Sequence, residues 1–182
     1  MSKIEGERMF LPVNIAVLTV SDTRTTADDR SGQTLVERIT AAGHKVTRRE
    51  IVQDEIPLIV KQLRQWIAAS DVDVIIATGG TGVTGRDVTP EAFREVIEKE
   101  IPGFGELFRW LSYQKIKTST IQSRAMAGVA GGKYLFALPG SPGACRDAWD
   151  DILREQLDAR HKPCNFVELM PRLKEHLGGG RG

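Results

Sequence analysis

The sequence has few cysteines and no long apolar run. Only 2 of its 182 residues are cysteines, Cys145 and Cys164, and they lack metal-site spacing and any disulfide framework. No stretch approaches the roughly 18 consecutive apolar residues that a membrane-spanning helix needs. Residues 1–8 carry mixed charge without the apolar segment of a signal peptide. We therefore expect no membrane segment and a cytoplasmic location, with Cys145 serving as a small buried residue of a helix.

The sequence also lacks an excess of charge of either sign. Lys and Arg number 25 and Asp and Glu 24, and no basic run stands out. The electrostatic basis of nonspecific nucleic-acid binding is therefore missing, and we expect no nucleic acid partner. The length and the 41% hydrophobic content predict one compact domain. We place it at residues 13–162, between an N-terminal tail at 1–12 and a C-terminal tail at 163–182, whose last five residues we expect to be disordered.

Short apolar runs alternate with segments of helical periodicity. The runs predict strands at 13–20, 45–52, 73–78 and 134–138, and the periodic segments predict helices at 32–42, 56–69, 89–100, 104–116, 122–129 and 143–159. Alternating strands and helices predict an α/β fold, a three-layer αβα sandwich with a mainly parallel sheet. Ligands of such sheets bind beyond the carboxyl ends of the strands. The loops after Val20, Val52, Thr78 and Leu138 should therefore meet at one edge of the sheet.

The loop from Gly79 to Glu91 has the clearest chemical character. Four glycines lie within 79–85, directly after a predicted buried strand. Glycine permits positive φ and close backbone approach, so successive amides can form an anion-binding nest. Arg86 and Asp87 stand where a P-loop would have its lysine and hydroxyl residue, so the loop is not of that type. A tight strand-to-helix turn with surplus glycine is the alternative. Thr89 is the expected N-cap of the following helix.

Two carboxylates adjoin this predicted nest. Asp87 lies inside the loop, where it would repel phosphate unless a cation lay between them; Mg²⁺ is commonly held by one or two carboxylates and phosphate oxygens. Asp54 follows the second predicted strand. Local spacing favours an N-cap role for Asp54, because a helix begins at Ile56, over a role in a metal site.

Other polar segments have two possible roles. Ser21, the segment 29–32, and Ser123 with Arg124 could bind phosphate or cap the helices that follow. We expect His44, His161 and His176 to be solvated, and no pairing of a nucleophile with a base is evident.

Seven ordered motifs resemble the MoaB/MogA family of molybdenum cofactor biosynthesis proteins. They are Leu18–Asp22, Asp29–Gly32, Thr78–Gly82, Arg86–Glu91, Pro102–Glu106, Gln122–Arg124 and Leu138–Pro142. The resemblance covers nearly everything from Val13 to about Arg172, and Arg160–Phe166 is similar to the MoaB branch.

This resemblance implies an activity, in which AMP is transferred from Mg-ATP to the terminal phosphate of molybdopterin and pyrophosphate is released. It assigns Asp54 and Asp87 as the catalytic, Mg²⁺-binding carboxylates, in place of the cap role for Asp54. The residues expected to contact the substrate or the nucleotide are Ser21, Gly79, Gly80, Thr81, Gly82, Ser123, Pro139, Gly140 and Ser141. It also implies a homotrimer or hexamer and partners among other proteins of the pathway. Adenylylating members often have an amide residue where this chain has Ser141. A noncatalytic protein that binds or delivers molybdopterin is the alternative.

Overall fold

The computed structural model describes residues 3–4 and 8–175. The predicted disorder of the last five residues, and His176, lie outside this range. The strands form a six-stranded sheet in the order β3-β2-β4-β7-β6-β5 and a two-stranded pair, β1-β8. Their bounds are β1 Lys3–Ile4, β2 Asn14–Val20, β3 Lys45–Val52, β4 Val74–Thr78, β5 Lys99–Glu100, β6 Met126–Ala130, β7 Lys133–Leu138 and β8 His161–Lys162.

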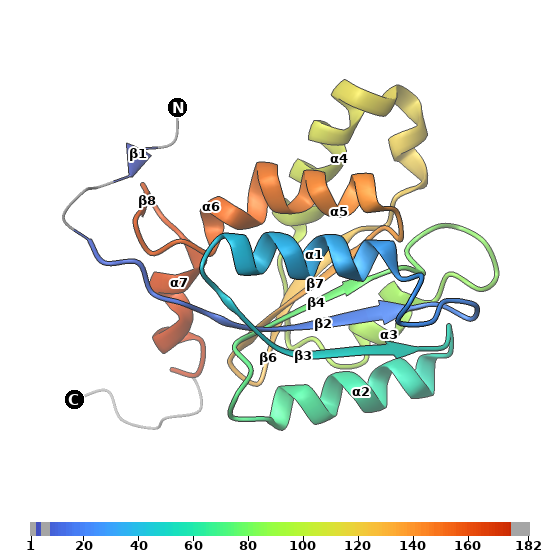
Figure 1. Ribbon diagram of the computed structural model, residues 1–182, viewed down its shortest axis with the longest axis horizontal. Coiled ribbons are helices and arrows are strands. Elements are labelled where there is room, and N and C mark those ends of the chain that lie inside the picture. The colour runs from blue at the N-terminus through green and yellow to red at the C-terminus, as the bar shows by residue number, and fades with distance from the viewer. Residues whose placement is uncertain (1–2, 5–7, 176–182) are drawn as a thin grey trace.

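The sheet is mainly parallel, as predicted. Strands β3, β2, β4 and β7 run in one direction, whereas β6 and β5 add an antiparallel edge. Helices cover both faces, and Figure 1 shows α1, α5 and α6 above the sheet and α2 and α3 below it. The helices are α1 Arg30–Ala41, α2 Ile56–Ala68, α3 Thr89–Arg94, α4 Pro102–Ile116, α5 Pro142–Ala148, α6 Arg154–Gln156 and α7 Phe166–Leu169. The three-layer αβα sandwich is therefore confirmed.

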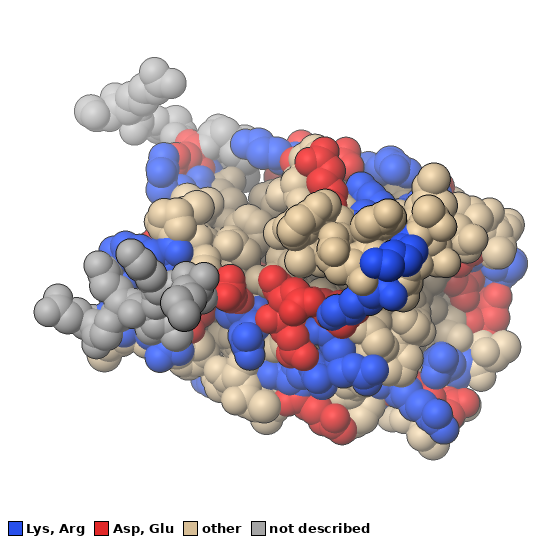
Figure 2. All heavy atoms as spheres, turned by 90° about the horizontal axis from the view of Figure 1, so that it is seen from above, with Lys and Arg blue, Asp and Glu red and all other residues tan. Residues whose placement is uncertain are grey.

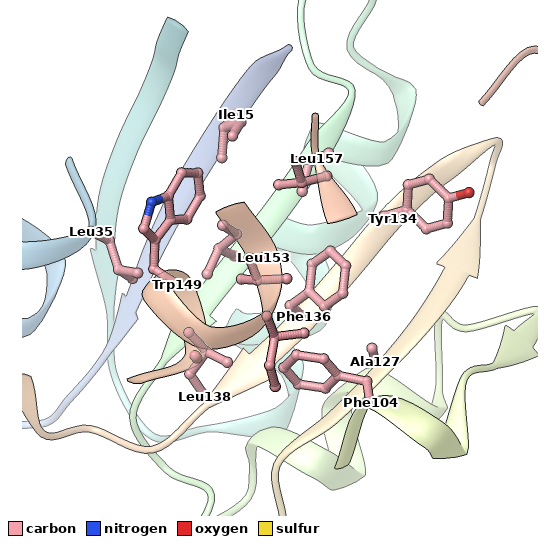
Figure 3. Close-up of a cluster of buried hydrophobic side chains, with 14 of the residues drawn as sticks. Ile15, Leu35, Phe104, Ala127, Tyr134, Phe136, Leu138, Trp149, Leu153 and Leu157 are labelled. Carbon is pink, nitrogen blue, oxygen red and sulfur yellow. The ribbon is translucent and has the colours of Figure 1, made fainter. Parts of the chain in front are cut away.

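The two faces of the sheet carry separate apolar cores, because side chains alternate along each strand. Ile15 and Val17 of β2 point to the core beneath α1, α4 and α5, while Ala16 and Leu18 point to the core against α2 and α3. In Figure 3 Trp149, Leu153 and Leu157 lie over Phe136 and Leu138 in the first of these cores. Cys145 lies fully buried in the same core, as predicted.

The predicted helix at 122–129 is wrong. Residues Lys117–Gln122 form a 3₁₀ helix, and Met126–Ala130 form strand β6. Local helix propensity fails here because the strand packs closely against its surroundings: a Cβ atom on Gly128 would lie 2.6 Å from the Ile97 side chain. Gly131 and Gly132, both at positive φ, then make the two-residue turn into β7.

Two further helices differ from the prediction. The helix predicted at 89–100 ends already at Arg94, and Lys99–Glu100 form a strand that pairs with β6. Its N-cap is Val88 rather than Thr89, whose hydroxyl donates to the Gly79 carbonyl at 2.8 Å. The helix that starts at Pro142 is interrupted by a π-helical stretch, Trp149–Leu153, before α6.

Part of the predicted C-terminal tail packs against the domain. Phe166 contacts the Tyr134 ring at a centroid distance of 4.6 Å, and its carbonyl accepts a hydrogen bond from the Tyr134 hydroxyl at 3.1 Å. Val167 is buried in the core beneath α5. These contacts stabilise α7, which the sequence periodicity did not predict.

His44 is buried, so the prediction that it is solvated is wrong. It is 5% exposed, between Phe10 and Trp149, and its Nδ1 accepts a hydrogen bond from the Val13 amide at 3.1 Å. Burial lowers the pKa of His44, although the charge of Asp158 acts in the opposite direction.

Within the described range, no helix combines the length and the apolar character that crossing a membrane requires. Figure 2 shows acidic and basic side chains interspersed over the face that carries α1 and α5. No broad area of one sign lies on that face.

Candidate functional site

Two adjoining pockets lie beyond the carboxyl ends of the parallel strands. The larger pocket has a volume of about 490 Å³ and the smaller about 250 Å³. Gly80, Asp87 and Gly140 line both pockets and form a wall between them. Two ligands, one in each pocket, would therefore meet at this wall.

The predicted site residues all line one or both pockets. The smaller pocket has Ser21, Asp54 and Gly79, the larger has Thr81, Gly82, Ser123, Pro139 and Ser141, and the shared wall has the rest. The structure thus brings together residues from the four loops that follow the parallel strands, in the place that the sheet predicted, and adds Ser123 from the segment before β6. Their roles stay predictions.

Two successive glycines of the loop have positive φ, and two of its amides are left without an acceptor within the described range. Gly79 and Gly80 have φ of 107° and 62°. The carbonyls of Gly79, Gly80 and Thr81 accept hydrogen bonds from within the protein, at 2.8 to 3.0 Å. The amides of Gly80 and Thr81, by contrast, donate to no acceptor among the described residues. Amides left free in this way are suited to phosphate oxygens.

Arg124 stabilises the glycine loop through hydrogen bonds instead of binding an anion. Its guanidinium donates to the carbonyls of Gly82 and Asp87, each at 2.6 Å, and also pairs with Glu91. With its donors used in this way, Arg124 sets the distance between the two ends of the loop. The prediction that it grips an anion is not supported by these contacts.

Asp54 and Asp87 have different electrostatic surroundings. Burial, and then the charge of Asp22, raise the pKa of Asp54, with a smaller contribution from Asp87. Burial also acts to raise the pKa of Asp87, but hydrogen bonds from Thr84 and Gly82 outweigh it and leave that pKa below its usual value. Asp54 is not the N-cap of α2, because Glu55 occupies that position without a side-chain bond.

Two arginines line the smaller pocket, Arg24 and Arg86. The Arg86 guanidinium donates to both carboxylate oxygens of Asp22, which lies beside the pocket. In the sequence Asp22 only ends the motif Leu18–Asp22 and has no local signal of a role, because its partners lie in other loops. Its position beside the pocket became visible only in the fold.

Helices α4 and α5 line the side of the larger pocket away from the wall. Phe108, Ser112 and Ile116 come from α4, and Ala144 and Asp147 come from α5. Sequence reasoning missed these residues as pocket residues, since helix periodicity does not reveal which side of a helix faces a cavity. Ser141 caps α5 by accepting from the Ala144 amide at 3.1 Å. Asparagine is an equally good N-cap, so serine in place of an amide residue keeps this interaction.

The carboxylates of the smaller pocket fit a magnesium ion that is shared with phosphate. Within the described range no three His, Cys, Asp or Glu side chains cluster in the manner of an all-protein metal site. Mg²⁺ needs no such cluster, because it commonly takes one or two carboxylates and completes its shell with water and phosphate oxygens. Asp54 and Asp87 both line the smaller pocket and supply that donor set.

Comparison with known proteins decides the family. The family described as "Probable molybdopterin binding domain" matches residues 16–159. The chain belongs to this family. It is 49% identical to the molybdenum cofactor biosynthesis protein B of Escherichia coli (strain K12) over 96% of this chain and 100% of that protein. The protein of the same name from Halalkalibacterium halodurans is 47% identical, over 85% and 92% of the two chains.

Solved structures of the family share the fold. A crystal structure of a molybdenum cofactor biosynthesis protein B is 40% identical and superposes with a TM-score of 0.83, over 92% of this chain and 99% of that one. The tungsten cofactor synthesizing protein MoaB from Pyrococcus furiosus is 35% identical with a TM-score of 0.70, over 79% and 92%. The present chain is thus a molybdenum cofactor biosynthesis protein of the MoaB/MogA type.

Proposed function

We propose that this protein transfers AMP from ATP to the terminal phosphate of molybdopterin. The observation that carries the proposal is the wall that the two pockets share, formed by Gly80, Asp87 and Gly140. A pterin phosphate in the larger pocket and a nucleotide in the smaller one would bring their phosphates together there. The family match supports the choice of molybdopterin as substrate.

The reaction is one in-line displacement. An oxygen of the molybdopterin phosphate forms a bond to the α-phosphorus of ATP, and the bond from that phosphorus to the bridging oxygen breaks, releasing pyrophosphate. No covalent intermediate with the protein is needed. Positioning and charge neutralisation are then the main contributions to catalysis.

The residues of the two pockets have different parts in this reaction. The free amides of Gly80 and Thr81 orient phosphate oxygens, and Ser123 and Ser141 line the pterin side. Asp54 and Asp87 hold Mg²⁺, which would neutralise charge on the phosphates when bound. Arg86, fixed by Asp22, and Arg24 place positive charge on the nucleotide side.

The test is adenylylation in vitro. The protein is incubated with molybdopterin, ATP and MgCl₂, and adenylyl-molybdopterin and pyrophosphate are quantified. We expect Asp54→Asn and Asp87→Asn to lower the rate by about 100-fold or more, the scale of losing a major electrostatic contribution to the transition state. Asp71→Asn, on the surface and outside both pockets, is the control. Retained binding of molybdopterin without any product would contradict the proposal and favour a noncatalytic carrier.

We also propose that the protein self-associates as a homotrimer or a hexamer. The outer face of α4 and the following 3₁₀ helix expose Leu107, Trp110, Tyr113 and Ile121, at 43 to 82% of their surface. Contiguous exposed apolar side chains of this size are typical of an interface. Phe104 and Phe108 of the same helix are buried in the core. Light scattering gives the mass, and Trp110→Glu should shift it toward the monomer; a monomeric wild type would contradict the proposal.

A further inference from the structure

The side of the larger pocket formed by α4 and α5 differs in character from the glycine wall. Phe108, Ile116 and Ala144 make it apolar, and only two polar groups of these helices interrupt it, Ser112 and Asp147. A pocket of this kind, mostly apolar with a few placed polar groups, binds a ring system and fixes its orientation. The polar groups therefore indicate which ring edge is bound.

The Ser112 hydroxyl lines the larger pocket and has no hydrogen-bond partner in the part of the chain that the structure describes. The residue as a whole is only 6% exposed, but its oxygen is not among the fully buried polar atoms without a partner. A hydroxyl at an interior helix position often bonds the carbonyl four residues earlier, as Thr34 does with Arg30, and Ser112 makes no such bond. The Ser112 hydroxyl is therefore available to a ligand in the pocket.

Asp147 presents one oxygen to the same pocket. Its Oδ1 accepts from the Lys115 ammonium at 2.6 Å, and that ammonium also donates to Asp151 at 3.1 Å. Its Oδ2 accepts nothing from the described residues. Lys115 therefore fixes the orientation of the carboxylate, while the two carboxylates around one ammonium leave a net negative charge at this end of the pocket.

We infer that Asp147 and Ser112 recognise the 2-amino-4-oxopyrimidine edge of the pterin ring. That edge has adjacent N–H donors at positions 2 and 3, which a carboxylate accepts, and a 4-oxo group, which a hydroxyl can donate to. The assignment rests on the proposed function, because it takes the larger pocket as the pterin site. It goes further by naming the residues that select a 2-amino pterin over a ring with oxygen at position 2.

The probes are neopterin monophosphate and its 2-oxo (lumazine) analogue, titrated by ligand fluorescence. With the wild type we expect the 2-amino probe to bind about tenfold more tightly, the size of one hydrogen bond to a charged group. Asp147→Asn should abolish or reverse this preference, since the amide N–H₂ can donate to the 2-oxo group. Ser112→Ala should weaken both probes about equally, because both carry the 4-oxo group.

Asp151→Asn is the matched control. It also removes one negative charge beside Lys115, but Asp151 does not line the pocket, so the preference should remain. Thermal melting checks that each variant is folded. Equal binding of the two probes by the wild type, or equal loss of preference in Asp147→Asn and Asp151→Asn, would overturn the inference. If the wild type still binds and adenylylates molybdopterin, the proposed function survives that result.

Discussion

The Arg86 guanidinium donates to both carboxylate oxygens of Asp22, at 2.9 and 2.7 Å. Oδ1 of the same carboxylate accepts from the backbone amide of Asp54 at 3.1 Å. One side chain thereby joins the loops after β2, β3 and β4. Asp22 thus positions both the loop with Asp54 and the loop with Asp87 without itself having to contact a substrate.

Asp22→Asn should lower the rate of adenylylation about tenfold, because it weakens a charge-assisted contact that aligns two loops. Thermal stability should change little, since exposed ion pairs contribute little to it. The control is Asp71→Asn, which breaks an exposed pair with Arg48 away from the pockets. A rate loss no larger than that of the control would contradict a positioning role.

Arg124→Lys should destabilise the glycine loop. A lysine cannot reach the carbonyls of Gly82 and Asp87 and the Glu91 carboxylate together, so we expect a loss of about 1–2 kcal/mol in the free energy of unfolding. Arg94→Lys is the control, because Arg94 reaches Glu91 only at 3.7 Å and from the surface. Urea denaturation measures both; similar values for the two variants would refute the special role of Arg124.

Gly79→Ala should destabilise the protein by about 2 kcal/mol or more, a value typical of a backbone forced into a strained region. The residue has φ of 107°, and a Cβ atom there would lie 2.2 Å from the Val20 carbonyl oxygen. Gly85→Ala offers the contrast, since a Cβ atom on Gly85 meets nothing within 4 Å. Its stability should change by less than about 0.5 kcal/mol. Stable, fully active Gly79→Ala would show that the loop does not need this conformation.

These residues show how far the sequence could be interpreted. Apolar runs predicted the parallel strands, and the glycines that follow them predicted the edge of the sheet where ligands bind. Both predictions succeeded because buried strands and strand-to-helix turns have strong local sequence signals. Local spacing favoured a cap at Asp54, and only the family resemblance pointed to the site. The antiparallel strand β6 was missed because close packing of Gly128 against Ile97 overrides the helix propensity of its neighbours. Asp147 had no local signal, since its pocket forms between two helices.

His44 should make stability depend on pH. Burial lowers its pKa in the folded state, so below the unfolded value of about 6.5 the unfolded chain binds more protons than the folded one. The free energy of unfolding should therefore fall as the pH drops below that value. Urea titrations between pH 5 and 7.5 should show a shallower dependence in His44→Gln. If the free energy of unfolding depends equally on pH in the wild type and in His44→Gln, His44 does not cause this dependence.

The two cysteines should differ in reactivity. Burial raises the pKa of Cys145 to about 11, whereas Cys164 is exposed. Because the thiolate is the reactive form, a disulfide reagent at pH 8 should modify one thiol of the native chain quickly and both only after unfolding. Mass spectrometry of the native product should find the label on Cys164. Rapid labelling of Cys145 would mean that the core beneath α5 opens readily.

The wall of Gly80, Asp87 and Gly140, which the two pockets share, has a consequence for the product of the proposed reaction. A molecule that spans the wall uses the contacts of both pockets but loses its translational freedom only once, as a bivalent ligand does. The adenylylated product should therefore bind more tightly than either substrate. Release of the product, rather than the chemical step, would then limit turnover. The protein that carries out the next reaction could receive the product directly from this one.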